Sequence, residues 1–320
     1  MRILITGAAG FIGSHLSEKL LNSGHQIIGI DNFDAFYNRN IKEDNLKVAL
    51  QNPLFSFYEL DITNSSDFDK WPVKIDVVVH LAAKAGVRPS IENPEAYLKT
   101  NILGTLNVLE YMRKTGCQNL VFASSSSVYG NNTKIPFEES DTTDHPISPY
   151  AASKKSCELL IYNYHKLYQL NCINLRFFTV FGPRQRPDLA IHKFVKKISA
   201  NEPIEVYGQG DSARDYTFVE DTISGIVESI NYIHSNQNVF ETINLGNNSP
   251  ISLKVLIQKI ETHLGKKAKL NFQPMQDGDV DITFSSIEKA KILLNYNPET
   301  SIDEGLEKFI SWYKNQNYNT

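Results

Sequence analysis

Short apolar runs alternate with longer segments of helical pattern along the first half of the chain. The runs cover residues 3–6, 27–30, 55–58, 76–80, 120–124 and 173–176. Apolar runs that alternate with helices are typical of a parallel sheet covered on both faces. The pattern therefore predicts an α/β fold built on a doubly wound parallel sheet.

The pattern changes after Thr179, where a Pro- and Arg-rich stretch precedes amphipathic helices expected at 191–199, 253–264 and 303–314. Segments 218–231 and 241–245 are expected to return to the sheet. Residues 1–178 and about 215–250 are thus predicted to form the sheet domain. Residues 179–214 and about 251–320 are predicted to form a smaller, mostly C-terminal α/β domain. A ligand cleft is expected between the two lobes, at the carboxyl ends of the strands.

Composition narrows the classes of protein. The chain has 320 residues, 41% of them hydrophobic, and a net charge of −4 without a basic patch. This excludes nucleic acid and anionic membranes as expected partners. Three cysteines, Cys117, Cys157 and Cys172, are too few for a disulfide framework and are expected to be core residues. No histidine pair has metal-ligand spacing and no apolar run approaches a membrane span, so we expect a cytoplasmic protein without a metal.

A glycine-rich turn follows the first apolar run. Gly7, Gly10 and Gly13 lie between a predicted strand and a helical segment beginning near Ser14. Such a turn lets the backbone approach a pyrophosphate at the helix N-terminus, as in Rossmann dinucleotide-binding domains. Asp31 ends the second run, where a carboxylate can bind the ribose hydroxyls and repel a 2′-phosphate. Residues 32–37 contain no Arg or Lys, so NAD is expected over NADP.

Tyr150 and Lys154 are four residues apart and share one face of a predicted helix. A phenol with a pKa near 10 is a poor base at neutral pH. A fixed ammonium group beside it would lower that pKa, so that Tyr150 could take a proton from an alcohol. The same spacing also occurs in solvated surface pairs.

Taken together, these motifs resemble the extended short-chain dehydrogenase/reductase family, and within it the nucleotide-sugar epimerases. The shared features are Gly7–Gly13, Asp31, Asp61-Ile62, His80–Ala83, Asn101, Ser124–Gly130, Tyr150/Lys154, Arg176–Asp188, Gly208–Val219 and Pro274–Asp279. The resemblance covers nearly the whole chain. It implies a Rossmann fold, a bound NAD, and oxidation and re-reduction at C4 of a UDP-sugar through a 4-keto intermediate.

The resemblance also implies roles for individual residues. Catalysis is assigned to Tyr150, Lys154, Ser125 and Ser127, although at least two of the four consecutive serines 124–127 are expected to bond the backbone instead. The NAD contacts are expected from Gly7, Gly10, Phe11, Ile12, Gly13, Asp31, Asn32, Asp61, Ile62, Leu81, Ala82, Ala83, Asn101, Tyr150 and Lys154. Asp61 has an alternative role, as the cap of a helix starting near Ser65.

The implied sugar is UDP-glucuronate, converted to UDP-galacturonate. Thr179 and Arg186 would hold its C6 carboxylate, which keeps the 4-keto acid out of the geometry that favours decarboxylation. The other substrate contacts implied are Arg88, Ser126, Arg214, Gln276 and Asp279. Alternatively, Arg186 binds phosphate or forms a surface ion pair with Asp188. A dehydratase would carry an Asp-Glu pair in the loop where this chain has serines, so dehydration is disfavoured.

Other functions stay open at this level. They are 4-epimerisation of UDP-glucose or UDP-N-acetylglucosamine, UDP-glucuronate decarboxylation, C4 reduction, and a silent dinucleotide sensor. The intact Tyr150/Lys154 pair argues against the sensor. Segments 94–114 and 150–168 carry apolar residues on more than one face, including Leu103 and Leu159. One face covers the sheet, so we expect the second to pair across a two-fold axis in a homodimer.

Overall fold

The computed structural model describes residues 1–71, 74–275 and 280–316. Its largest element is a parallel sheet whose strands are ordered β10-β6-β5-β4-β1-β2-β3. The strands are β1 (Arg2–Thr6), β2 (Gln26–Asp31), β3 (Phe55–Glu59), β4 (Val77–His80), β5 (Asn119–Ser125), β6 (Asn171–Phe177) and β10 (Phe240–Leu245). The predicted doubly wound α/β fold is confirmed.

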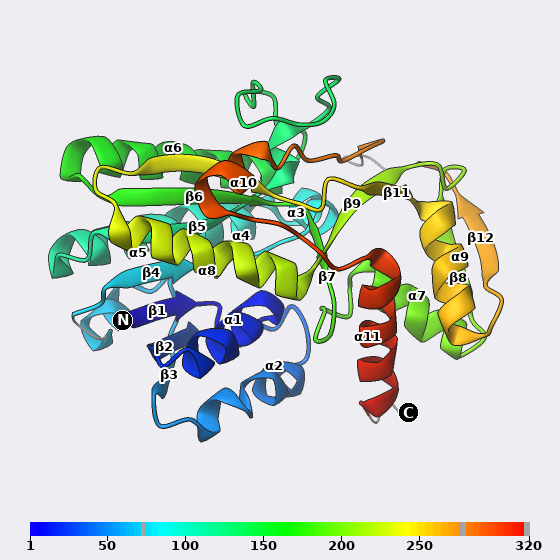
Figure 1. The fold of residues 1–320 in the computed structure, drawn as a ribbon, viewed down its shortest axis with the longest axis horizontal. Helices are drawn as coiled ribbons and strands as arrows, with labels where there is room; N and C mark the ends of the chain where they lie inside the picture. Colours follow the sequence, from blue (N-terminus) through cyan, green and yellow to red (C-terminus); the bar gives the residue numbers. More distant parts are fainter. Residues whose placement is uncertain (72–73, 276–279, 317–320) are drawn as a thin grey trace.

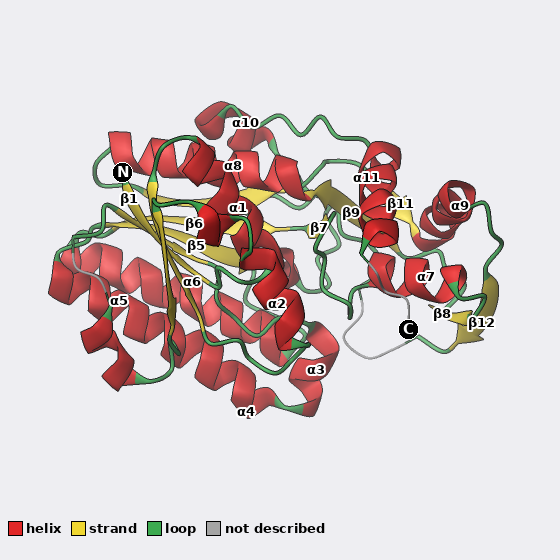
Figure 2. Ribbon diagram, turned by 90° about the horizontal axis from the view of Figure 1, so that it is seen from below, coloured by secondary structure: helices red, strands yellow, loops and turns green. Residues whose placement is uncertain are grey.

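Helices cover both faces of this sheet (Figure 2). One face packs against α1 (Phe11–Asn22), α8 (Val219–Ser235) and α10 (Glu288–Leu294). The other packs against α5 (Gly104–Thr115) and α6 (Pro149–Tyr168), with the short α3 (Val87–Glu92) and α4 (Pro94–Tyr97) beside them. The helix α2 (Arg39–Leu46) follows β2. A π-helical turn, η3 (Leu98–Leu103), divides the single helix expected over 94–114.

Alternation along the strands explains why two helical layers are needed. In β1, Ile3 and Ile5 enter the core shared with α1 and α8, whereas Leu4 enters the core shared with α5 and α6. All three side chains are fully buried. Because successive side chains of a strand point to opposite faces, an all-apolar strand is stable only between two apolar layers.

Among the described residues, the second lobe is built from small sheets flanked by helices (Figure 1). Its strands are β7 (Thr179–Phe181), β9 (Ala213–Phe218) and β11 (Pro250–Ser252) in one sheet, and β8 (Pro203–Tyr207) and β12 (Lys269–Gln273) in the other. Its helices are α7 (Ala190–Ser199), α9 (Leu253–Leu264) and α11 (Ile302–Asn315). Residue boundaries between the two domains stay a prediction.

Only Phe178 separates β6, in the large sheet, from β7, in the small one. Its backbone N–H donates to the carbonyl oxygen of Leu245 at 3.1 Å, and Thr179 then pairs with Tyr216 of β9. One almost continuous extended segment therefore passes from the large sheet of the first lobe into a small sheet of the second.

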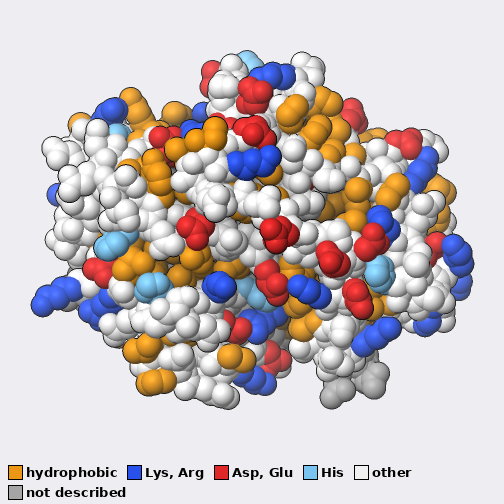
Figure 3. Space-filling view, viewed as in Figure 1, with side chains coloured by type: hydrophobic (Ala, Val, Ile, Leu, Met, Phe, Trp, Pro, Cys, Tyr) orange, Lys and Arg blue, Asp and Glu red, His pale blue; other side chains and the backbone are white. Residues whose placement is uncertain are grey.

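The surface carries mixed charge. Figure 3 shows basic and acidic side chains interspersed over one face, in keeping with the small net charge of −4. Among the residues described, no helix combines the length and apolar character that a membrane span requires.

Candidate functional site

A cavity of about 690 Å³ opens between the two lobes. Strand order reverses between β1 and β4, and in such sheets ligands bind at the carboxyl ends of the strands beside this reversal. Predicted site residues that line the cavity are Gly7, Gly10, Phe11, Ile12, Gly13, Asp31, Asn32, Ile62, Leu81, Ala82, Ala83, Arg88, Ser125, Ser126, Ser127, Tyr150, Lys154, Thr179, Arg186 and Arg214. Gln276 and Asp279 lie outside the described residues.

The glycine turn shapes the entrance of α1. Gly7 has a φ of +75°, and a Cβ on it would lie 2.9 Å from the backbone nitrogen of Ala82. A Cβ on Gly13 would lie 2.2 Å from the carbonyl oxygen of Gly7, so only glycine lets α1 approach β1 this closely. The helix begins at Phe11 without a side-chain cap or an acidic residue in its first turn. Its N-terminus therefore suits a bound pyrophosphate.

Asp31 ends β2 as a buried carboxylate. It accepts hydrogen bonds from the backbone nitrogens of Phe33 at 2.8 Å and Ala9 at 3.2 Å. Burial raises the pKa of Asp31 above its ordinary value, while the charge of Lys42 and the two N–H donors act to lower it. Lys42 Nζ lies 4.0 Å from Asp31 Oδ1 and donates to the carbonyl oxygen of Asp34 at 2.8 Å.

Two predicted cofactor residues do not line the cavity. Asp61 accepts hydrogen bonds from the backbone and side chain of Thr63 and, at 2.9 Å, from Asn32 Nδ2. The alternative of a helix cap is wrong for Asp61, because Asn64 caps the short helix at Ser65–Lys70. Asn101 is 2% exposed, and its amide bonds both backbone polar groups of Lys84. Asn101 thus fixes the backbone of the segment that follows β4 without lining the cavity itself.

Tyr150 and Lys154 lie in the first turns of α6, which Ser148 caps by accepting from the backbone nitrogen of Ala151. Burial raises the pKa of Tyr150 above its ordinary value, while a hydrogen bond with Ser125 and the charge of Arg186 act to lower it. Lys154 Nζ instead donates to the carbonyl oxygen of Ala123 at 2.7 Å. In this arrangement Arg186, not Lys154 as expected, supplies the positive charge acting on the phenol. Burial lowers the pKa of Lys154 to about 8.

The first two of the four consecutive serines form hydrogen bonds within the protein. Ser124 donates to Glu158 Oε1 at 2.6 Å, and Glu158 also pairs with Arg176 at 2.9 Å inside the protein. Ser125 accepts from the backbone nitrogen of Ser127 at 3.1 Å and so caps the short helix η4 (Ser126–Tyr129). Ser125 nevertheless acts to lower the pKa of Tyr150, and it lines the cavity with Ser126 and Ser127.

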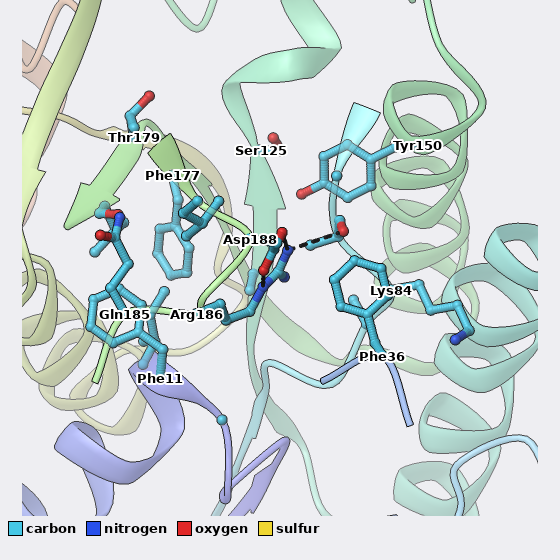
Figure 4. Close-up of a pocket in the computed structure, with 18 of the residues that line it drawn as sticks. Phe11, Phe36, Lys84, Ser125, Tyr150, Phe177, Thr179, Gln185, Arg186 and Asp188 are labelled. Carbon is cyan, nitrogen blue, oxygen red and sulfur yellow. Dashed lines mark hydrogen bonds and ion pairs between the residues drawn. The ribbon is translucent and has the colours of Figure 1, made fainter. Parts of the chain in front are cut away.

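Arg186 lies near the centre of the cavity view, with its guanidinium 5.1 Å from the ring centre of Phe36 (Figure 4). Its fork is bidentate to Asp188, with Nε–Oδ1 at 2.9 Å and Nη2–Oδ2 at 2.7 Å. Burial acts to lower the pKa of Arg186, but the hydrogen bonds and charge of Asp188 outweigh it and raise the pKa. The alternative of an ion pair with Asp188 is therefore present, in the cavity wall instead of on the open surface.

The other predicted substrate residues come from the second lobe and its border. Thr179 begins β7 and lines the cavity (Figure 4). Arg214 Nη1 donates to the carbonyl oxygen of its neighbour Ala213 at 2.9 Å. The Arg88 guanidinium lies 4.4 Å from the ring centre of Tyr207 in β8, so it joins the two lobes.

Sequence reasoning missed several polar groups in this cavity. Lys42 comes from α2, beyond the window searched for a cation, and Lys84 Nζ lies 2.8 Å from Asp34 Oδ2. Gln185 is 2% exposed, and its Oε1 has no hydrogen-bond partner among the described residues. Its Nε2 faces the carbonyl oxygen of Val180 at 3.4 Å, and the residue lines the cavity. The sequence signal for a loop at this place is the Gly-Pro-Arg-Gln segment at 182–185.

Residues expected to be structural are buried. His80 bonds Thr6 at 2.7 Å and Thr105 at 3.1 Å, and burial lowers the pKa of His80 to about 3. The three cysteines are free and buried. Among residues 1–71, 74–275 and 280–316, no group of His, Cys, Asp or Glu could hold a metal ion.

Known proteins share this arrangement. The pattern of the GDP-mannose 4,6-dehydratase family matches residues 4–309. A UDP-glucuronate 4-epimerase of Thermodesulfobacterium geofontis is 43% identical over 97% of this chain and 95% of that protein. A variant of the UDP-glucuronic acid 4-epimerase of Bacillus cereus, solved with NAD and a fluorinated UDP-glucuronic acid, superposes with a TM-score of 0.93 at 37% identity, covering 98% of this chain and 99% of that one.

A UDP-glucose 4-epimerase of Thermotoga maritima, solved with UDP-glucose, gives a TM-score of 0.89 at 30% identity, with 98% of this chain and 99% of that chain covered. The similarity therefore extends to epimerases of both acidic and neutral sugars. From this match over nearly its whole length, the chain belongs to the GDP-mannose 4,6-dehydratase family of extended short-chain dehydrogenases/reductases, among its nucleotide-sugar epimerases, and UDP-glucuronate 4-epimerases are among the proteins that it resembles.

Proposed function

We propose that UDP-glucuronate is the sugar nucleotide on which this NAD-dependent UDP-sugar 4-epimerase acts, with UDP-galacturonate as its product. The observation that carries the proposal is the position of Arg186, a guanidinium in the cavity wall whose charge acts on Tyr150. A C4 hydroxyl at Tyr150 would put the neighbouring C6 group of the sugar on the Arg186 side of the cavity. An arginine fork is well matched to a carboxylate there.

The residues present fit NAD. The turn at Gly7 and the uncapped N-terminus of α1 suit a pyrophosphate, and Asp31 suits a ribose with two free hydroxyls. Lys154, which lines the same cavity, would hold the second ribose. When bound, NAD would supply the hydride acceptor for oxidation at C4 of the sugar and, as NADH, the hydride donor for its re-reduction.

Tyr150 would take the proton from the C4 hydroxyl and later give it back. Burial raises the pKa of Tyr150, whereas Ser125 and the positive charge of Arg186 act to lower it and so favour the phenolate that this transfer requires. Tyr150 and Arg186 both line the cavity between the lobes, so the 4-keto sugar would stay in contact with them between the two hydride transfers. Oxidation and re-reduction at one carbon leave no net redox change.

Arg186 and Thr179 would hold the C6 carboxylate throughout. A 4-keto glucuronate is a β-keto acid, which loses carbon dioxide when the bond to the carboxylate aligns with the carbonyl π system. A fork that fixes the carboxylate out of this alignment protects the intermediate. The serines at 125–127 stand where a dehydratase carries an acidic pair, so elimination has no acid in this loop.

Further substrate contacts are proposed for Arg88, Ser126 and Arg214, all of which line the cavity. Gln276 and Asp279 stay predictions from the sequence. The relatives support the choice of sugar, since the Bacillus cereus enzyme has also been solved with UDP-glucuronic acid and NAD.

A second candidate is a neutral UDP-hexose such as UDP-glucose. The specific observation in its favour is that Asp188 forms an ion pair with Arg186. The positive charge of Arg186 is therefore already compensated without a substrate carboxylate. A UDP-glucose 4-epimerase is also among the similar structures.

Product analysis separates the two. Purified protein would be incubated separately with UDP-glucuronate, UDP-glucose and UDP-N-acetylglucosamine, and the products identified by NMR. We expect UDP-galacturonate to form with the highest kcat/KM. Turnover of only the neutral sugars would reject UDP-glucuronate, and a UDP-pentose product would indicate a decarboxylase.

A homodimer is proposed as well. Apolar side chains on η3 and α6 are exposed although the two elements pack together: Leu98, Leu103, Leu159, Tyr162, Leu167 and Tyr168. A second copy of the same face would bury them around a two-fold axis.

A further inference from the structure

The Arg186 fork is occupied by a carboxylate of the protein itself. Asp188, two residues along the same loop, takes both donors on one edge of the guanidinium, at 2.9 and 2.7 Å. The side chains are 17% and 32% exposed, and both line the cavity (Figure 4). Asp188 therefore lies where a bound carboxylate would form the same two hydrogen bonds.

Few donors of Arg186 are left for a ligand. Of the five N–H groups that an arginine offers, Nε and Nη2 serve Asp188, and Nη2 also faces the carbonyl oxygen of Ala85 at 3.3 Å. A second carboxylate could reach only the Nη1 side while Asp188 stays in place. The bidentate site is thus available only to one carboxylate at a time.

Charge leads to the same conclusion. Asp188 compensates the charge of Arg186, and the nearby Lys84 is paired with Asp34 at 2.8 Å. An acidic sugar entering this wall would meet Asp188 as a like charge in a partly desolvated site, which disfavours both carboxylates being ionised side by side. A neutral sugar would meet no such repulsion.

We propose that Asp188 is a specificity-determining residue that competes with the sugar carboxylate for Arg186. It holds the fork while the site contains no acidic sugar and gives way when the C6 carboxylate of UDP-glucuronate binds. Because Asp188 must be displaced first, the protein prefers UDP-glucuronate over UDP-glucose less strongly than it would with Arg186 alone. This inference rests on the proposed function, because it assumes that the C6 group reaches Arg186.

The test is equilibrium binding to NAD-loaded protein in a Tyr150→Phe background, where turnover does not interfere. Dissociation constants for UDP-glucuronate and UDP-glucose would be measured with and without Asp188→Asn. We expect Asp188→Asn to tighten UDP-glucuronate binding about tenfold, within the range for a partly buried charge pair, and to change UDP-glucose binding less than about twofold.

Two variants serve as controls. Asp34→Asn removes the same charge from the same cavity without touching the Arg186 fork, so it should tighten UDP-glucuronate much less. Asp188→Glu keeps the charge and should return the dissociation constants toward those of the Tyr150→Phe parent. NAD content and melting temperature would verify that each variant is folded.

The outcomes are distinguishable. If Asp188→Asn weakens UDP-glucuronate as Arg186→Ala does, Asp188 only orients Arg186 and the proposal is overturned. Equal effects on both sugars, or no effect, would also overturn it. If the parent binds only UDP-glucose and Asp188→Asn gains UDP-glucuronate, the competition stands while the proposed function fails. If the parent binds the acid and the variant is unchanged, the proposed function survives without the competition.

Discussion

His15 Nε2, in α1, lies 2.9 Å from the carbonyl oxygen of Pro183, in the loop that follows β7. Glu18, one turn further along α1, lies 2.8 Å from Arg184 of the same loop. The helix that would bind the cofactor pyrophosphate and the loop that carries Arg186 are thus joined by two polar contacts. These contacts tie the position of the loop to that of α1.

Replacing His15 by Phe removes the donor and loosens this loop. Because a neutral hydrogen bond contributes about 1 kcal/mol, we expect KM for the UDP-sugar to rise about fivefold while NAD content and melting temperature change little. Steady-state kinetics measure the effect. The control is His234→Phe, at an exposed position on α8. A rise confined to NAD dissociation, with KM for the sugar unchanged, would contradict the coupling.

Tyr150→Phe removes the proposed proton acceptor but keeps the ring. The variant should fold and retain NAD, and lose at least about 10²-fold in kcat, the usual size of a general-base effect. Tyr162→Phe, on the exposed side of the same helix, should keep its activity. Near wild-type epimerisation by Tyr150→Phe would reject Tyr150 as the base.

Arg186→Ala leaves a substrate carboxylate without its partner in a partly desolvated site. We expect the activation free energy that corresponds to kcat/KM for UDP-glucuronate to rise by about 2–5 kcal/mol. That for UDP-glucose should rise much less. Since the change also leaves Asp188 unpaired, the double variant Arg186→Ala with Asp188→Asn should be compared. An equal loss for both sugars would make Arg186 a phosphate-binding or structural residue.

His80 should make stability depend on pH. Its pKa in the folded protein is about 3, below the unfolded value of 6.5, so the unfolded state takes up the proton first as pH falls. The free energy of unfolding should therefore decrease below pH 6.5, by up to about 1.4 kcal/mol per pH unit from this group. Urea unfolding at pH 7, 6 and 5 should show a shallower decrease for His80→Asn than for the wild type. The exposed His145→Asn should keep the wild-type slope.

The proposed dimer can be tested at Leu159, which is 59% exposed on α6. Light scattering at micromolar concentration should give a dimer for the wild type and a monomer of 36.2 kDa for Leu159→Lys, because a buried unpaired charge disfavours association. A wild-type mass of 36.2 kDa would contradict the prediction. Leu270→Lys, on β12, is a control for the loss of an exposed leucine elsewhere.

The strands and the glycine turn could be predicted because their signals are local. Residues such as Ile3 and Leu4 are apolar on successive positions, and only a doubly covered sheet buries both. The cavity wall after β7 depends instead on the path of a loop. Arg184 has a φ of +64°, a left-handed conformation that non-glycine residues rarely adopt, directly before Gln185 and Arg186. No pattern in the sequence predicts a left-handed conformation at this arginine.

Electrostatic partners were the least predictable part. The spacing of Tyr150 and Lys154 placed both in one cavity, but not the inward turn of Lys154 to the carbonyl oxygen of Ala123. Lys42 reaches Asp31 from a separate helix whose sequence gives no apolar pattern to locate it. Pairings of this kind are decided by tertiary packing.

The passage from β6 to β7 limits how such a protein can change over evolution. Since side chains of a strand alternate in direction, one inserted residue beside Phe178 would turn Thr179 away from the cavity and shift its pairing with Tyr216. Helices and loops of the second lobe can vary in length without this effect. New sugar preferences are therefore expected to arise by exchange of side chains along 179–188 and by remodelling of distant loops, whereas insertions at this crossing would be eliminated.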